Sequence, residues 1–392
     1  MDMKRYLMTN NIIFEPRCSK RTRAAAGWNH QLVILFVLLA ILLLGISAFG
    51  QDPNYSQWLN TPVYYNPAFT GLNKGMRAKL SYRDQWPNLP VDYRTMYFSA
   101  DLGDRSLPGA GGFGLIINSD NQSFGFIKNL SASLTLSARI PMNAWLSAQV
   151  GIKGGIMQKS MNWDDFVFSD QLNDRYGNIT NTQLPPPDAQ QRLFPDFGAG
   201  GLLQFAALDG MIIGTTGFAV DHVFEPDESF YNIDRSRLPR KYVGHLDVVI
   251  SLGEGEPGKS QVRGFNDPLR LNPGILYQNQ NNLSSIQAGI NALKYNIYLG
   301  CYYQSTAIDN NSSSLMILAG YRYVISDQAT VKFMYSYDVE LSGKMAGTGG
   351  AHEISLILEL STLKLFGKNR YEECPALQSK EIKFTRLECS PF

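Results

Sequence analysis

The feature of this sequence that most restricts its fold is an alternation of apolar and polar residues that recurs along the chain after residue 75. Leu134, Leu136 and Ala138, for example, are separated by Thr135 and Ser137. Successive residues of a β-strand point to opposite faces of its sheet, so each such segment has one apolar face and one polar face. The alternation therefore predicts an all-β fold.

About fourteen segments show this pattern, each roughly eight to thirteen residues long, close to the length that a tilted strand needs to cross a bilayer. An even number of strands suits a barrel whose two chain ends lie on the same side of the membrane. The segments are residues 75–83, 91–102, 111–118, 128–140, 145–157, 196–206, 211–221, 242–252, 272–280, 284–292, 296–304, 314–324, 329–339 and 352–361.

The lengths of the connections support a membrane barrel, because such barrels alternate short periplasmic turns with long extracellular loops. Most connections follow this rule, although the long connection over residues 253–271 falls on the expected periplasmic side. The pattern predicts a transmembrane antiparallel β-barrel of about fourteen strands. Short connections are expected at residues 141–144, 207–210, 293–295 and 325–328, and long ones at 158–195 and 222–241.

A soluble β-sandwich or a lipocalin-like barrel would show the same alternation, with the apolar faces pointing inward. Two features favour the membrane barrel. The strands are long and numerous for a sandwich, and their polar faces carry small residues with scattered charges, as a wet or plugged lumen would. No apolar run long enough for a membrane helix follows residue 51, and only helices and closed barrels satisfy their backbone in lipid.

A targeting segment precedes the strands. Several basic residues are followed by a mostly apolar run over residues 32–49, with the small residues Ala48 and Gly50 at its end. This arrangement is typical of a secretory signal peptide. We expect residues 1–50 to be removed by cleavage before Gln51. An uncleaved anchor is the alternative, because the apolar run is at the lower edge of spanning length.

Two segments are expected to lie outside the barrel, which should occupy residues 75–366. Residues 51–74 lack the alternation and are rich in Asn, Pro and Tyr. They are expected to form a periplasmic N-terminal lead-in, with a plug-like strap as the alternative. Residues 367–392 are charged and are expected to form a periplasmic C-terminal tail, so both termini of the mature chain should be periplasmic.

Cysteines and charge narrow the functional classes. Cys374 and Cys389 share the tail and are candidate disulfide partners in an oxidising compartment. Cys301 lies in an apolar strand pattern and is expected to be buried or lipid-facing. The 35 Lys and Arg residues nearly balance the 34 Asp and Glu residues, and no basic patch points to nucleic acid.

Two phosphate-binding patterns match only superficially. Residues 253–260 fit the P-loop pattern, but the prolines that follow prevent the helix that a P-loop requires. Gly109, Gly111 and Gly114 fit the dinucleotide-binding pattern, but the next residues read as strand. Both matches are expected to be features of loops or turns.

Nothing in the sequence supplies a catalytic or metal centre. His222, His245 and His352 each lack a second histidine at ligand spacing, and no G-x-S-x-G elbow is present. Acidic and amide residues in the 158–195 connection could ligate calcium, but a solvated polar loop is the preferred interpretation. We expect no catalytic residue, no cofactor and no metal.

One group of charged residues is expected to have a structural role in closing the barrel. If the first strand pairs with the last, Arg77, Lys79 and Arg83 would face the lumen near Glu353 and Glu359. Opposite charges there would fix the register of the closing strands. The alternative is a set of unpaired charges in a watery interior.

Two multi-residue blocks, one at each end of the expected mature chain, carry a family resemblance. The N-terminal block contains Gln51, Asp52, Pro53, Ser56, Gln57, Asn66, Pro67, Ala68 and Gly71. The C-terminal block contains Gly320, Tyr321, Arg322, Tyr335, Ser336, Tyr337, Asp338, Gly349, Gly350, His352 and Glu353. The first resembles the QDPxFSQ and NPAxAG patterns of the PorP/SprF family, and the second resembles its GYR, YSYD and GGSHEIS patterns.

Some positions depart from the family pattern, and others have a structural role that can be predicted. Tyr55, Thr70 and Ala351 differ slightly from the usual residues, and residues 158–240 match weakly. Residues 66–68 should make a fixed turn, because Pro locks φ and Asn favours turns. In the YSYD block, Tyr335 and Tyr337 should face lipid, while Ser336 and Asp338 face the lumen.

The resemblance implies an outer-membrane protein of the type IX secretion system in a Gram-negative bacterium of the Bacteroidetes type. Such proteins assist secretion of surface proteins or retain a partner adhesin at the cell surface, sometimes in gliding motility, and are not enzymes. The implied partners are a secreted surface protein or adhesin, other periplasmic and outer-membrane components of the system, and outer-membrane lipid. A passive porin for small solutes is the alternative function.

Overall fold

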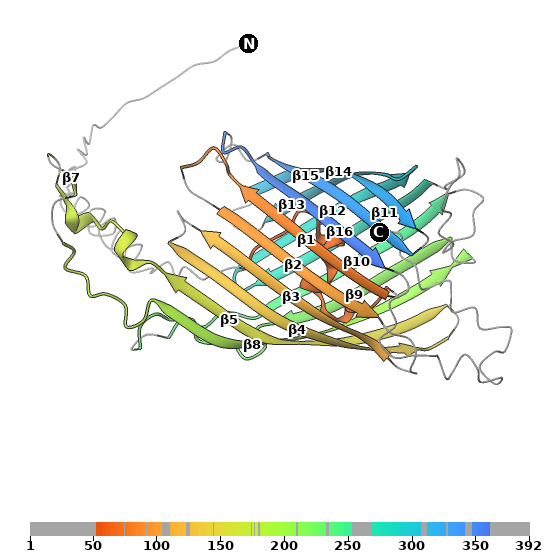
Figure 1. Cartoon of the computed structure of the whole chain (residues 1–392), viewed down its shortest axis with the longest axis horizontal. Coiled ribbons are helices and arrows are strands. Elements are labelled where there is room, and N and C mark those ends of the chain that lie inside the picture. The colour runs from red at the N-terminus through yellow and green to blue at the C-terminus, as the bar shows by residue number, and fades with distance from the viewer. Residues whose placement is uncertain are drawn as a thin grey trace, which may run out of the picture. The chain divides into compact units, whose positions relative to one another are not determined.

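The alternating segments form strands, and these strands close into a barrel (Figure 1). The computed structural model describes residues 52–360 except 74, 91–92, 104–109, 123–125, 144, 174, 176, 179–180, 209–210, 233–234, 253–268, 307–311, 327 and 342–346. The 14 barrel strands follow one another around the wall in chain order. The first strand pairs antiparallel with both the second and the last, which closes the ring.

The barrel strands are β1 (Gly75–Gln85), β2 (Tyr93–Gly103), β3 (Ala110–Gln122), β4 (Ile127–Pro141), β5 (Leu146–Met161), β8 (Gln191–Ala207), β9 (Ile212–Asp221), β10 (Lys241–Leu252), β11 (Leu269–Gln280), β12 (Leu283–Lys294), β13 (Ile297–Thr306), β14 (Ser312–Ser326), β15 (Ala329–Glu340) and β16 (Ala351–Leu360). Every predicted strand coincides with one of them. The remaining strands, β6 (Leu172–Asn173) and β7 (Gly177–Asn178), form a small hairpin in the long connection after β5. This hairpin was not predicted, because two-residue strands are too short to show an alternation.

Helices play a minor part. They are η1 (Trp58–Asn60), α2 (Pro62–Tyr65), η2 (Pro67–Phe69), η3 (Trp163–Asp165) and η4 (Ser169–Gln171). Within the described residues, no helix is long and apolar enough to cross a membrane. Gly111 and Gly114 lie inside β3, as expected, whereas Gly109 and residues 253–260 lie outside the described residues.

The two faces of the wall differ in the way that a membrane barrel requires. On β1, the side chain of Lys79 is 2% exposed, whereas that of its neighbour Leu80 is 55% exposed. The same holds around the ring, with apolar residues outward and polar residues inward, so the soluble alternative, in which the apolar faces point inward, is wrong. Cys301 is exposed on the outer face of β13, which confirms the lipid-facing alternative for this residue.

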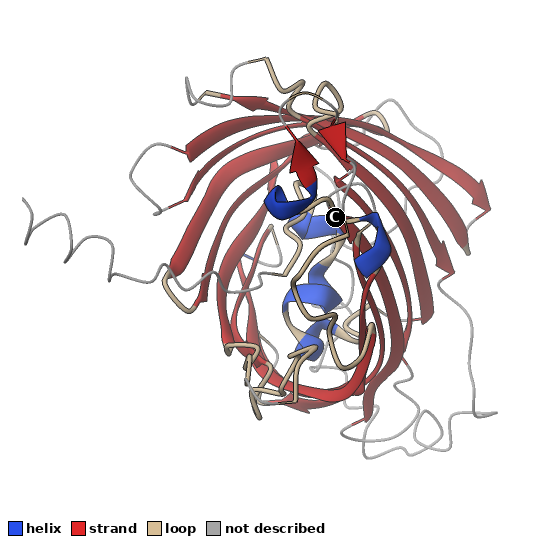
Figure 2. Ribbon diagram, turned by 90° about the vertical axis from the view of Figure 1, so that its left-hand side faces the viewer, coloured by secondary structure: helices blue, strands red, loops and turns tan. Residues whose placement is uncertain are grey.

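The segment before β1 lies inside the barrel and forms a plug, which we define as residues 52–73 (Figure 2). The expectation of a lead-in outside the barrel is therefore wrong, and the plug-like alternative holds. Its aromatic residues give the physical reason, because Tyr55, Trp58 and Tyr65 are each at most 2% exposed in the lumen. Large aromatic side chains with a polar tip are stabilised where the ring is buried and the tip finds a hydrogen-bond partner.

The plug runs along the lumen from one end of the barrel to the other. We call the end that contains Gly75 and Leu360 the short-turn end, and the opposite end, which carries the connections over residues 162–190 and 222–240, the long-loop end. The backbone N–H of Asp52 donates to Gln280 at the long-loop end (3.1 Å). Asp52 therefore lies at the long-loop end and Leu360 at the short-turn end. The expectation that both termini of the mature chain are periplasmic concerns residues 51 and 392, which lie outside the described residues.

Candidate functional site

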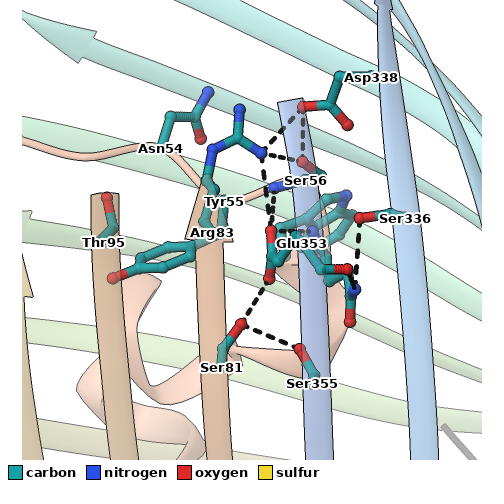
Figure 3. A network of polar contacts seen from close by, with 12 residues as sticks. Asn54, Tyr55, Ser56, Ser81, Arg83, Thr95, Ser336, Asp338, Glu353 and Ser355 are labelled. Carbon is teal, nitrogen blue, oxygen red and sulfur yellow. Dashed lines mark hydrogen bonds and ion pairs between the residues drawn. The ribbon is translucent and has the colours of Figure 1, made fainter. Parts of the chain in front are cut away.

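The two family-like blocks, which are about 280 residues apart in sequence, meet inside the lumen (Figure 3). The Ser56 hydroxyl donates to Asp338 Oδ2 (2.6 Å). The Gln57 side-chain amide donates to the Ser336 hydroxyl (3.3 Å) and to the backbone carbonyl of Glu353 (3.1 Å). The matching residues of the N-terminal block thus bind those of the C-terminal block, and we call this set of contacts the plug lock.

Glu353 is the centre of the plug lock and is fully buried. Its Oε2 accepts hydrogen bonds from the backbone N–H groups of Ser56 (2.9 Å) and Gln57 (3.4 Å), and its Oε1 accepts one from the Ser81 hydroxyl (2.9 Å). Arg83 lies 3.8 Å from the same carboxylate. A buried carboxylate is costly unless it is paired and hydrogen-bonded, and here the plug backbone supplies part of that compensation.

Arg83 joins the two acidic residues of the lock. Its Nη1 lies 2.9 Å from Asp338 Oδ2 and also donates to the Ser56 hydroxyl. One guanidinium from β1 therefore contacts carboxylates from β15 and β16 and a hydroxyl from the plug. Such charge-assisted bonds are among the strongest in proteins, so the lock ties the plug to the seam at which the barrel closes.

The predicted turn at residues 66–68 is confirmed, and it also attaches the plug to the wall. The Asn66 side chain accepts a hydrogen bond from the Ala68 N–H (2.9 Å) and so caps η2. Its amide nitrogen donates to the Gly201 carbonyl of β8 (3.1 Å) and lies 3.1 Å from His245 Nε2 of β10. Asn66 thus shapes the plug and binds two strands of the wall.

Gly71 ends the plug against the wall near the short-turn end. Its N–H donates to Asp101 Oδ2 (3.0 Å), and its φ is +62°. A Cβ atom at this position would lie 2.5 Å from the Cα atom of Gly112 and 2.8 Å from the Gly111 carbonyl oxygen. Only glycine fits such a close approach of two backbones.

A second polar cluster holds the other end of the plug, and we call it the latch. Asp52 Oδ2 lies 2.9 Å from His222 Nε2 and 3.3 Å from Lys241 Nζ, and His222 Nδ1 lies 2.8 Å from Asp196. On the wall, Lys153 Nζ lies 2.6 Å from Asp221 and 4.0 Å from Asp196. The latch consists of Asp52, Lys153, Asp196, Asp221, His222 and Lys241.

The charges of the latch shift the pKa values of its two loop-end members. Burial alone would raise the pKa of the Asp52 carboxyl, but the charges of His222 and Lys241 hold it well below its usual range. Burial would lower the pKa of His222, but the charge of Asp52 and the hydrogen bond with Asp196 raise it to about 10. At neutral pH, Asp52 is therefore ionised and His222 is protonated.

The predicted charges of the closing strands are paired, though only partly as expected. β1 pairs with β16, with Arg77 opposite Glu359 and Arg83 opposite Glu353. Arg83 contacts Glu353 as predicted, whereas Arg77 pairs with Asp101 on β2 (3.2 Å). Glu359 pairs instead with Lys332 of β15 (2.9 Å). Arg77 lies directly opposite Glu359 on β16, as predicted, but it also lies directly opposite Asp101 on β2 and forms its ion pair there. Lys332 reaches Glu359 diagonally, since its direct partner on β16 is Ile357.

Lys79 is buried, and its Nζ has no hydrogen-bond partner among the described residues. It lies 5.8 Å from the centroid of the Tyr97 ring, which places a cation over the face of an aromatic ring. Tyr97 belongs to the apolar cluster that packs around the plug. Lys79 thus faces the lumen as predicted but contacts an aromatic ring rather than forming a direct ion pair.

Several other family-like residues of the C-terminal block have partners in the wall. Arg322 donates to the Asn296 side chain (3.0 and 2.8 Å) and supports the turn between β12 and β13. On the outer face, the Tyr335 hydroxyl lies 2.8 Å from His352 Nδ1. Gly350 has φ +67°, and a Cβ there would lie 2.0 Å from the Asp338 carbonyl oxygen. These residues shape the wall, and Tyr335 faces outward as predicted.

The described residues contain no group of three or more His, Cys, Asp or Glu side chains placed to hold a metal ion. His222 and His245 both face the lumen, and each contacts the plug. Sequence reasoning missed these roles because their partners, Asp52 and Asn66, are far away in the chain. Gln51, Cys374 and Cys389 lie outside the described residues.

The sequence model of the type IX secretion system membrane protein PorP/SprF matches residues 47–358, which is most of the chain and includes the whole plug and nearly all of the barrel. The chain belongs to the PorP/SprF family. It is therefore an outer-membrane β-barrel of a type IX secretion family, and that family consists of secretion components rather than enzymes.

Solved structures similar to this PorP/SprF protein are outer-membrane barrels. A Pseudomonas aeruginosa FadL homologue is 14% identical at a TM-score of 0.40, covering 81% of this chain and 96% of its own. The CymD monoaromatic hydrocarbon channel is 11% identical at 0.41, covering 80% and 95%. Acinetobacter baumannii Omp33 is 6% identical at 0.36, covering 74% and 99%. Among curated proteins, none matches the sequence.

Proposed function

We propose that this PorP/SprF protein is a non-enzymatic outer-membrane component of the type IX secretion system that assists the secretion or surface anchoring of a partner protein. A gliding adhesin is one candidate client. The long-loop end would face the cell exterior and hold the secreted chain. The short-turn end, together with the tail over residues 367–392, would face periplasmic components of the system.

The observation that supports this proposal is the occupied lumen. A passive solute channel needs an open lumen whose polar lining sets selectivity. Here the lumen contains a folded plug, and the residues that match the family at both ends of the chain bind each other to hold it. The residues that match the family patterns thus hold the plug that fills the lumen. A filled lumen favours action through protein partners over passive passage of solutes.

The plug is attached around most of the wall, which argues against a loosely held obstruction. Its partners come from strands on all sides of the lumen. They include Asn118 of β3, Thr135 of β4, Gln149 of β5, Gly201 of β8, Gln280 of β11, Gln287 of β12 and Ser336 of β15.

Gene deletion in a host with an intact type IX system tests the proposal. The deletion should reduce the amount of one or more type IX cargo proteins at the cell surface or in the medium, measured by quantitative mass spectrometry of surface-shaved and secreted fractions. Reintroduction of the wild-type chain should restore them. The purified complex should contain a cargo protein or another component of the system.

Two outcomes would count against the proposal. If surface and secreted cargo were unchanged by the deletion, the protein would have no role in secretion or retention. If the purified protein formed a large, stable open pore in planar bilayers, the passive-porin alternative would replace it.

A further inference from the structure

The plug has a direction, and its N-terminal end lies at the long-loop end. Asp52 contacts His222, which directly follows β9, and Lys241, with which β10 begins. Its backbone contacts Gln280, with which β11 ends. All three partners lie at the same end of the wall, opposite Gly75 and Leu360.

The plug continues from there toward the short-turn end. Ser56 contacts Asp338, two residues before the end of β15 at the long-loop end. Asn66 contacts Gly201 and His245 part-way along their strands. Gly71 lies against Gly112 and Gly103, and the second of these is the last residue of β2 at the short-turn end. The chain therefore enters the lumen at one end and joins β1 at the other.

Charge complementarity fixes Asp52 at this end. Asp52 Oδ2 lies 2.9 Å from His222 Nε2 and 3.3 Å from Lys241 Nζ at this end of the wall. The carboxylate is thus paired with two basic groups in a partly buried site, where an unpaired charge is costly. The position of Asp52 is thus set by the wall and is not a chance placement of a chain end.

A cavity of about 150 Å³ adjoins Asp52. Its lining comes from the long-loop end and includes Lys159 at the end of β5 and Glu228 and Leu238 in the connection after β9. Toward the short-turn end, the plug itself fills the lumen with buried aromatic residues. Among the described residues, the free space beside Asp52 therefore lies at the long-loop end.

We infer that the plug is seated with its N-terminal end outermost, so that the N-terminus of the processed chain is displayed on the cell surface, among the long loops. The outward direction of those loops rests on the proposed function. A further consequence concerns the order of leader removal and plug insertion. A leader that remains in the inner membrane cannot stay attached to a residue at the outer mouth, so it must be removed before the plug takes its place.

Epitope accessibility tests this inference. One epitope is inserted between Gly50 and Gln51, and two separate control chains carry it after Asn232 in the 222–240 connection or after Gln328 in a short turn. Antibody labelling is measured on intact and on permeabilised cells. The N-terminal epitope should be labelled on intact cells to the same extent as the Asn232 epitope, and the Gln328 epitope only after permeabilisation.

The outcomes separate this inference from the proposed function. If the N-terminal epitope behaved like the Gln328 epitope, the inference would be overturned. If the N-terminal and Asn232 epitopes were both protected while the Gln328 epitope was exposed, the plug direction would hold but the proposed orientation of the barrel in the membrane would be wrong.

A cross-linking experiment tests the direction without an insertion. In the full chain in native membranes, a short bis-maleimide should cross-link the pair Asp52→Cys and Gln280→Cys. The pair Asp52→Cys and Asp101→Cys, which places the second cysteine near the short-turn end, should not react. Single-cysteine variants control for Cys301, Cys374 and Cys389. A product from the second pair alone would overturn the inference.

Discussion

At the scale of single residues, the plug is held by a few buried charges whose partners come from distant parts of the chain. Glu353, Arg83 and Asp338 form one group and the six residues of the latch form another. Each group contains both signs of charge, and each receives part of its compensation from the plug. Removal of one member therefore leaves another charge buried without its partner, which costs far more than loss of a surface ion pair.

Glu353→Ala should destabilise the protein by about 3–5 kcal/mol, because two plug N–H groups and Arg83 lose an acceptor in a buried site. The loss can be measured as a lower temperature for the mobility shift of the folded barrel in electrophoresis. Glu225→Ala is the matched control, since its pair with Arg240 is exposed and should contribute about 1 kcal/mol or less. Equal effects of the two substitutions would contradict the buried-lock interpretation.

The latch should hold across neutral pH and fail at its alkaline limit. A histidine whose pKa is raised to about 10 contributes stability that is complete below its ordinary pKa of about 6.5 and is lost as pH rises through the folded value. Asp52, whose pKa is lowered, contributes above about pH 4 and loses that contribution on acidification.

Protease accessibility of the plug as a function of pH measures this dependence. The wild-type plug should become easier to cleave near pH 10, and His222→Gln should be easier to cleave already at pH 7, with a smaller change near pH 10. Identical alkaline profiles for the two proteins would show that His222 does not hold the plug.

At the scale of elements, the pairing of β1 with β16 and the attachment of the plug end to the wall involve close backbone contacts and charged side chains that face the lumen. β1 pairs with β2 and β16, and its Arg83 donates to the Ser56 hydroxyl of the plug, so this strand takes part in both barrel closure and plug attachment. The turn at Gly71 joins the plug to β1 and has no space for a side chain.

Gly71→Ala should displace the end of the plug. A left-handed conformation costs a non-glycine residue roughly 1–2 kcal/mol, and the clash with Gly112 adds to it. Gly177→Ala is the control, because Gly177 has φ +74° but no described atom within 4 Å of its Cβ position. The difference in stability between the two variants, measured by thermal unfolding in detergent, reports the contact with the wall. Equal stabilities of the two variants would mean that the wall adjusts to the added methyl group without a measurable loss of stability.

Lys79→Glu should weaken barrel closure, because it places a second carboxylate in a buried site close to that of Glu353. A cost on the order of 3 kcal/mol is expected for an unpaired buried charge. Lys294→Glu at the exposed end of β12 is the control, with an expected change of about 0.5 kcal/mol or less. Unchanged heat-modifiability of Lys79→Glu would contradict a structural role for this cation.

At the scale of the whole molecule, the wall and the plug have different relations to the sequence. The wall was predictable because period two reports which residues of a strand share a face, and all 14 strands coincide with segments that show it. The location of the plug was not, because its contacts join residues such as Ser56 and Asp338 that are 282 positions apart. Its short helical turns also carry no periodic pattern.

Deletion of residues 52–73 should convert the barrel into a pore, because the inward polar residues of the wall would then line a water-filled lumen. Single-channel recording in planar bilayers should show a stable conductance for the deletion variant and none for the intact protein. Retained closure after the deletion would mean that other segments also block the lumen.

The plug lock also has a consequence for how the protein is made. Glu353 and Asp338 lie on the last two barrel strands to leave the ribosome, yet they bind the plug, which is the first described segment of the chain. That segment has no settled place until synthesis is complete and the ring has formed. A chain that stops before β15 lacks the residues that bind the plug, so Tyr55, Trp58 and Tyr65 should stay exposed to water and to proteases. Incomplete chains should therefore be degraded in preference to complete ones.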